Sequence, residues 1–160
     1  MWKLTVAANP HNQIEVSLGA ESRVGECYYL GLSDAARICA ESPAAENSGA
    51  QPDENSVQAG LQLLLRGWLQ QLLRLSDGGQ VFLPFDFSDE YTRWISVRRE
   101  GAEAELVFGW AAVEGWAICL EDFSDVAYGL TGFSPDEPMF IQRVYLPRLI
   151  CEVRRVMNDQ

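Results

Sequence analysis

The sequence predicts an α+β protein in which an antiparallel sheet carries a long amphipathic helix at about residues 55–75 and a C-terminal helix at about 144–157. Two patterns and the length point to this class. Short runs in which apolar and polar residues alternate are typical of strands, and longer stretches with an apolar residue every three or four positions are typical of helices. A chain of 160 residues suits one domain and is too short for two ordinary ones, so residues 1–160 are expected to form a single domain.

The first third of the chain is expected to form strands. Alternating residues at 2–6 and 14–18 flank a turn-forming stretch at 9–12, which is the pattern of a hairpin. A third apolar run at 24–32 predicts another strand, and a short capped helix is expected to follow over 35–41.

Residues 42–55 contain no large apolar residue and are rich in Pro, Ser and Asn, so they predict a mobile internal loop. The helix at 55–75 follows, with apolar residues at helical spacing from Val57 to Leu72. Its wide apolar stripe is typical of a core helix that packs on a sheet. The alternative is a seam between two copies of the chain, which would make a homodimer.

The second half of the chain is expected to return to strands and then to end in a helix. Apolar runs over about 80–120 predict a four-stranded antiparallel meander with a tight turn at 100–102. Apolar residues from 140 to 156 have helical spacing. Pro147 is best accommodated in the first turn of a helix, so the continuous helix is expected to begin near it.

The chain is strongly acidic, with 23 Asp and Glu against 12 Lys and Arg and a net charge of -11. Nucleic acids and anionic membrane surfaces attract basic proteins, so this balance excludes a general affinity for either. Residues 86–137 hold twelve acids and three bases, a local balance of -9, whereas residues 138–160 carry +2. The acids are interleaved with aromatic residues. This favours either a solvated surface or a face that binds a basic protein through aromatic anchors.

The cysteines and the single histidine give little support for a metal centre or a nucleophilic active site. Cys27, Cys39, Cys119 and Cys151 form no C-x-x-C pair, and His11 lies in a turn. Cys119 and Cys151 lie in apolar runs and are expected to be reduced residues of the core. No metal, cofactor or catalytic residue is expected. The sequence also lacks a signal peptide and a membrane-spanning run, which favours a cytoplasmic location.

Two short motifs recur. Asp-Phe-Ser-Asp occurs at 86–89 and at 122–125, and Asp and Ser form turns through hydrogen bonds to nearby backbone N–H groups. A sharper alternative is that the two acidic turns form a divalent-cation site or a catalytic carboxylate pair. Glycine precedes Trp68, Trp110 and Trp116, where its small size permits close packing.

The stretch 81–125, with its segment Pro-Phe-Asp-Phe-Ser-Asp, Arg93-Trp94 and two Gly-Trp pairs, resembles small bacterial proteins. Several of those proteins are immunity partners of polymorphic or contact-dependent toxins. The resemblance is at the level of a class, and it implies a cytoplasmic single domain that binds a protein.

The sequence therefore predicts a non-catalytic, acidic protein-binding domain, most concretely an immunity-type inhibitor of a basic toxin such as a nuclease. Two alternatives stay open. One is a dimeric chaperone of the type III secretion kind, and the other is a small enzyme or cation-binding module that uses the two Asp-Phe-Ser-Asp turns. The residues expected to contact a basic partner are Asp86, Asp89, Glu90, Trp110, Glu114, Glu121, Asp122 and Asp125.

Overall fold

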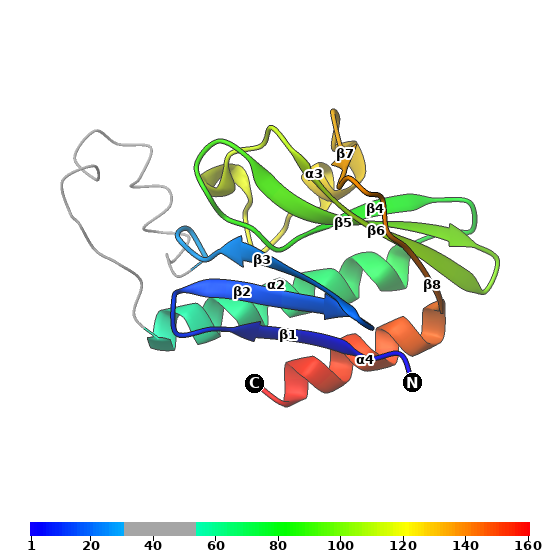
Figure 1. The fold of residues 1–160 in the computed structure, drawn as a ribbon, viewed down its shortest axis with the longest axis horizontal. Helices are drawn as coiled ribbons and strands as arrows, with labels where there is room; N and C mark the ends of the chain where they lie inside the picture. The colour runs from blue at the N-terminus through cyan, green and yellow to red at the C-terminus, as the bar shows by residue number, and fades with distance from the viewer. Residues whose placement is uncertain (31–53) are drawn as a thin grey trace.

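The computed structural model describes residues 1–30 and 54–160, with side chains described for residues 1–30 and 56–160. These residues form two antiparallel sheets with helices packed on them, so the predicted α+β class is confirmed (Figure 1). The short helix predicted at 35–41 and residues 42–53 of the predicted loop lie outside the described residues. The last two residues of that loop, 54 and 55, belong to a helix.

The first sheet has the strand order β1-β2-β3, made of β1 (Leu4–Ala8), β2 (Gln13–Leu18) and β3 (Glu21–Glu26). The predicted hairpin is confirmed, because β1 pairs antiparallel with β2 and Leu4 lies opposite Leu18. The third strand ends earlier than predicted. After β3 the chain forms a turn in which the Leu30 N–H donates to the Cys27 carbonyl, so residues 27–30 leave the sheet.

The second sheet is built around the consecutive strands β4 (Gln80–Pro84), β5 (Thr92–Glu100) and β6 (Glu103–Ala111). The fourth strand predicted before residue 120 is wrong. The chain leaves the sheet after β6 because the Val113 N–H bonds back to the Ala111 carbonyl and the Gly115 N–H donates to Ser88. A 3-10 helix (Gly115–Ala117) and α3 (Ser124–Gly129) follow, and β6 pairs instead with β7 (Ser134–Pro135) and β8 (Ile141–Tyr145).

Two long helices, α2 (Glu54–Arg74) and α4 (Leu146–Asn158), lie on the same side of the sheets (Figure 1). The expected start of α4 near Pro147 is confirmed, since the helix begins at Leu146. It begins two residues after 144, because residues 144 and 145 still pair with β6. The apolar stripe of α2 packs in the core of its own chain. Its buried members are Val57, Leu61, Leu64, Leu65, Trp68 and Leu72.

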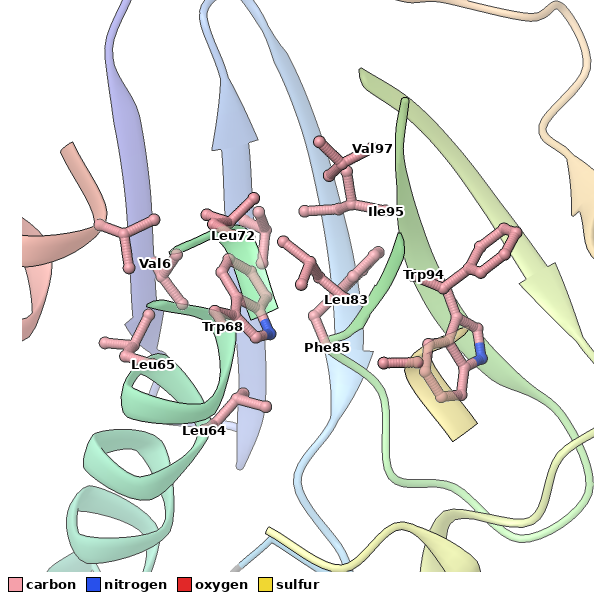
Figure 2. Packing of buried hydrophobic residues seen from close by; sticks show 14 of the residues in the cluster. Val6, Leu64, Leu65, Trp68, Leu72, Leu83, Phe85, Trp94, Ile95 and Val97 are labelled. Atoms are coloured by element: carbon pink, nitrogen blue, oxygen red, sulfur yellow. The ribbon is translucent and has the colours of Figure 1, made fainter. Parts of the chain in front are cut away.

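The core lies between α2 and the inner faces of both sheets. In Figure 2, Leu83, Ile95 and Val97 of the second sheet point toward α2, whereas Trp94 extends to the opposite side. The Trp68 indole also donates a hydrogen bond to the carbonyl of Pro84, at 2.9 Å. The helix and the second sheet are therefore joined by a directional contact as well as by apolar packing.

Each of the three Gly-Trp pairs marks a close approach to a phenylalanine. A Cβ at Gly67 would lie 2.3 Å from the ring of Phe123, and one at Gly109 would lie 2.4 Å from the ring of Phe133. A Cβ at Gly115 would lie 2.4 Å from the backbone of Phe87. These distances are too short for real contacts, so the glycines are required by packing, as the sequence pattern predicted.

The prediction that Cys119 and Cys151 belong to the core is wrong, because both are exposed. Ile118 and Leu120 take the buried positions on either side of Cys119, which leaves the thiol on the outer side. Cys151 lies on the solvent side of α4. Among the three cysteines that the structure describes, the buried one is Cys27, where burial and the nearby carboxylates of Glu26 and Asp86 raise the pKa of the thiol to about 12.

The two sheets are joined by the segment 85–87, which follows β4. The Phe87 N–H donates to the Glu26 carbonyl at 2.8 Å, and the Tyr29 N–H donates to the Phe87 carbonyl at 3.3 Å. Gly25 lies against the same segment, where an added Cβ would be 2.1 Å from the Phe85 carbonyl oxygen. We call this contact between the end of β3 and residues 85–87 the sheet joint.

The sheet joint predicts that Gly25→Ala destabilises the protein by about 1–3 kcal/mol, because the new methyl group overlaps backbone atoms that cannot move independently. Urea unfolding measures the change. Gly129→Ala is the matched control, since a Cβ there meets no atom within 4 Å and the residue lies in a helix. Equal stabilities of the two variants would contradict the close approach.

Candidate protein-binding surface

The first Asp-Phe-Ser-Asp motif forms a tight turn after the sheet joint. The Asp86 Oδ1 atom accepts hydrogen bonds from the Ser88 N–H at 3.0 Å and the Ser88 hydroxyl at 2.7 Å. Asp86 is only 6% exposed, so the structure places this predicted contact residue in the interior. Burial raises the pKa of Asp86, while hydrogen bonds from Ser88 and from the Glu26 N–H, and the charge of Arg93, act in the opposite direction.

The second motif repeats the same hydrogen bonds. The Asp122 Oδ1 atom accepts from the Ser124 N–H at 3.0 Å and from the Ser124 hydroxyl at 2.6 Å. Asp122 is exposed, and the bonds from Ser124 lower its pKa. In both copies the phenylalanine is buried, as Phe87 and Phe123. The interpretation of the motif as a turn former is confirmed, and the second copy also begins α3.

The first turn holds acidic side chains beside aromatic rings on the surface. The Tyr29 hydroxyl donates to Asp89 Oδ1 at 2.6 Å, and the ring of Tyr29 packs edge-on against Tyr28 with 4.7 Å between centroids. The Ser88 carbonyl accepts the Gly115 N–H at 2.7 Å, which places the chain carrying Glu114 and Trp116 next to this turn.

A second ring pair extends this surface along the sheet. Tyr91 lies two residues after the first turn, and its ring meets Trp110 edge-to-face with 5.3 Å between centroids. The Ser88 hydroxyl also contacts the Tyr91 carbonyl. We call the combined surface the aromatic–acidic patch, and its members are Tyr28, Tyr29, Asp89, Glu90, Tyr91, Trp110, Glu114 and Trp116.

The rings of the patch are more exposed than large apolar side chains usually are. The exposed fractions are 55% for Tyr28, 52% for Tyr91, 43% for Trp110 and 38% for Trp116. Exposed aromatic rings that gather in one place, bordered by polar groups, are typical of protein interfaces. Burial and the bond to Asp89 raise the pKa of Tyr29, so its hydroxyl stays a donor to that carboxylate at neutral pH.

The structure divides the eight predicted contact residues among three environments. Asp89, Glu90, Trp110 and Glu114 lie in the patch, and Asp86 is buried beneath it. The remaining three residues lie elsewhere, around the start of α3: Glu121, Asp122 and Asp125.

The α3 region packs against the end of α2. The Gln71 side chain donates to the Ser124 hydroxyl at 3.0 Å, the Tyr128 hydroxyl donates to the Gln71 carbonyl at 3.1 Å, and the charge of Arg74 acts on Asp122. The two turns are therefore anchored to different elements, and one acidic face that includes the exposed acids of both motifs stays a prediction.

Tyr28, Tyr29, Tyr91 and Trp116 are members of the patch that the sequence did not single out as contact residues. The pairing of Tyr29 with Asp89 joins residues sixty positions apart through the sheet joint. Tyr91 and Trp110 are brought together by the register of β5 and β6, in which Thr92 lies opposite Ala111. This second pair could have been found by aligning the two predicted strands about their turn at 100–102.

Within residues 1–30 and 54–160, no three or more His, Cys, Asp or Glu side chains are placed to hold a metal ion. The described helices likewise include none with the length and apolar character needed to cross a membrane. Comparisons with models of protein families, with curated proteins and with solved structures gave no match for this chain. Inference about function therefore starts from the geometry of the patch.

The first aspartates of the two Asp-Phe-Ser-Asp turns are expected to have pKa values on opposite sides of the ordinary aspartate value of about 3.9. The pKa of Asp86 is raised in the folded protein, so its contribution to stability falls as the pH rises from the unfolded pKa to the folded one. The pKa of Asp122 is lowered, so its contribution is present above the unfolded pKa and is lost as the pH falls through the folded one.

Carbon-13 NMR titration of the side-chain carboxyl groups measures both values. We expect Asp86 to titrate at a higher pH than Asp122. The variants Ser88→Ala and Ser124→Ala supply matched controls, because each removes the hydroxyl donor from one turn and should raise the pKa of its own aspartate only. Titration of Asp86 at or below the midpoint of Asp122 would refute its burial.

Proposed function

We propose that this chain is a non-catalytic domain that binds a basic protein through the aromatic–acidic patch. The most concrete form of the proposal is an immunity-type inhibitor that neutralises a basic bacterial toxin in the cytoplasm. The observation that carries it is the gathering of exposed rings and carboxylates at one end of the second sheet, held in place by the turn at 86–89.

The rings supply the binding energy in this proposal. Tyrosine and tryptophan bury a large area on binding and lose little conformational freedom, so they are common among the residues that dominate binding energy. Tyr91 and Trp110 already restrain each other through their edge-to-face contact. A partner that covers them therefore orders few additional rotamers.

The charges supply speed and orientation. A net charge of -11 creates a long-range attraction for a basic protein, and nearby carboxylates orient the approach. Asp89 is held by Tyr29, whereas Glu90 and Glu114 are exposed beside the rings. A nuclease is a suitable partner, because a cleft that attracts phosphate groups presents the positive potential this surface complements.

The secretion-chaperone alternative has less support. Such a function needs an apolar helix face that is open to a second copy or to a client protein. The apolar stripe of α2 is instead covered by its own chain, with Leu61, Leu64 and Leu65 fully buried. The patch is the more direct candidate for a binding surface.

Charge reversal within the patch should slow association with a basic partner. The probe is the purified C-terminal domain of a secreted toxin encoded beside this gene, and biolayer interferometry at low and high salt gives the rates. We expect Glu90→Lys to lower the association rate about tenfold at low salt and less at high salt. Glu15→Lys, an exposed position on β2 with the same change in net charge, is the matched control.

Equal rates for these two variants would leave only a general effect of net charge and would contradict a role for the patch. The absence of a toxin gene beside this one would contradict the immunity form of the proposal.

Removal of a central ring should instead speed dissociation. We expect Trp110→Ala to raise the dissociation rate of the same complex by about 10- to 100-fold and to change the association rate little, because ring burial is completed after docking. Tyr128→Ala is the matched control, since this exposed ring lies on α3 outside the patch. An unchanged dissociation rate for Trp110→Ala would remove the ring from the interface.

A further inference from the structure

The patch combines aromatic rings with carboxylates. Together these groups bind a guanidinium better than an ammonium ion. The rings of Tyr91 and Trp110 are partly exposed, and Glu90 precedes Tyr91 directly in the chain. Ring faces attract cations, and a planar guanidinium can stack on a ring while its N–H groups reach carboxylates at the edge. A lysine ammonium is a compact, strongly hydrated charge that gains less from a flat ring.

The same chemistry is already present inside this protein. The guanidinium of Arg23 lies over the ring of Phe108, with 5.1 Å from Cζ to the ring centroid. Its Nε donates to Asp136 Oδ2 at 2.7 Å, and one terminal nitrogen donates to Glu21 at 3.1 Å. One arginine is thus held by a ring face and two carboxylates, and this arrangement joins the first sheet to the second.

The patch has rings and carboxylates like those of this arrangement, and among residues 1–30 and 56–160 no arginine is placed over its rings. Arg93 is the cross-strand neighbour of Trp110, but its charge acts on the buried Asp86. Asp89 is oriented by the Tyr29 hydroxyl, which bonds to one of its two oxygens and leaves the carboxylate exposed at the surface. The carboxylate side of the patch is therefore fixed before a partner arrives.

We propose that the patch is an arginine-recognition surface, in which an arginine of the partner stacks on the Tyr91–Trp110 pair and bonds to the carboxylates beside it. This inference rests on the proposed function and adds the chemical identity of the partner's central residue. The partner presents arginine, not lysine, at the centre of its basic surface.

The test uses two probes of equal charge, hexa-arginine and hexa-lysine peptides, titrated into the full chain. Indole N–H signals in nitrogen-15 NMR spectra report on each tryptophan, and the buried Trp68 and Trp94 serve as internal references. We expect hexa-arginine to bind about two- to fivefold more tightly than hexa-lysine and to shift the Trp110 signal, as an exposed cation–π contact predicts.

Variants separate stacking from charge. Trp110→Ala should abolish the preference for arginine and retain the weaker binding that both peptides share. Glu90→Gln should weaken both peptides, and Tyr128→Ala, outside the patch, should change neither. Circular-dichroism melting confirms that each variant is folded.

Equal affinity for the two peptides, or a preference that survives Trp110→Ala, would overturn arginine recognition and leave the basic-partner proposal standing. Binding that shifts no signal from the patch would also overturn it. The proposed function itself is decided separately by the toxin measurements, which do not depend on these peptides.

Discussion

The backbone contact between the end of β3 and residues 85–87 determines how the rest of the molecule is arranged. Gly25 permits the approach, and two hydrogen bonds between residues 26–29 and Phe87 fix it. Besides this backbone contact, the two sheets are connected by the packing of α2 and by the side chain of Arg23, which reaches Phe108 and Asp136. The contact also sets the direction in which the chain leaves β4, so it orients the turn that carries Asp89 and Glu90. The position of the aromatic–acidic patch is thus a consequence of how the two sheets are joined.

The recurrence of Asp-Phe-Ser-Asp has a physical reason at each site. In both copies the aspartate accepts two bonds from the serine two residues later, which turns the chain and directs the phenylalanine inward. Each phenylalanine then meets the glycine of a Gly-Trp pair, Phe87 at Gly115 and Phe123 at Gly67. Asp-Phe-Ser-Asp and Gly-Trp therefore form the same packing arrangement at two places in the structure.

The pKa of Asp86 is raised and that of Asp122 is lowered because the surroundings of the two turns differ. At the sheet joint the first copy is covered by β3, so burial dominates. At α3 the second copy faces solvent, so the hydrogen bonds dominate. An identical local sequence thus provides a structural carboxylate in one place and an exposed charge in the other.

Local patterns predicted much of the fold, and long-range contacts account for the differences. The first hairpin, α2 and the three strands β4–β6 follow from periodicity and turn residues that act within about twenty positions. Residues 141–145 have the apolar content of a helix start, but pairing with β6 makes them a strand. Ile118 and Leu120 alternate as in a strand, yet they do not pair with β6 because β7 and β8 occupy that edge of the strand.

The candidate site was predicted in part for the same reason. Acids and aromatic residues of 86–116 are close in sequence, so the central part of the patch could be predicted. Tyr28 and Tyr29 enter it through the sheet joint, a contact that periodicity does not reveal. Solvent exposure also depends on tertiary structure, which is why Asp86 was misplaced on the surface and Cys119 in the core.

Part of the acid that is concentrated in residues 86–137 of the sequence does not lie in the patch. The balance of -9 over residues 86–137 suggested one acidic face, but some of these acids form ion pairs with arginines away from the patch. Asp136 pairs with Arg23 between the sheets, and Glu105 pairs with Arg98 and Arg143 at the far end of the strands. Under the proposed function, charge alone would attract a basic protein to the whole molecule and would select no particular surface. What distinguishes the patch is the coincidence of carboxylates with exposed rings, so the proposal requires the rings to determine where a partner docks.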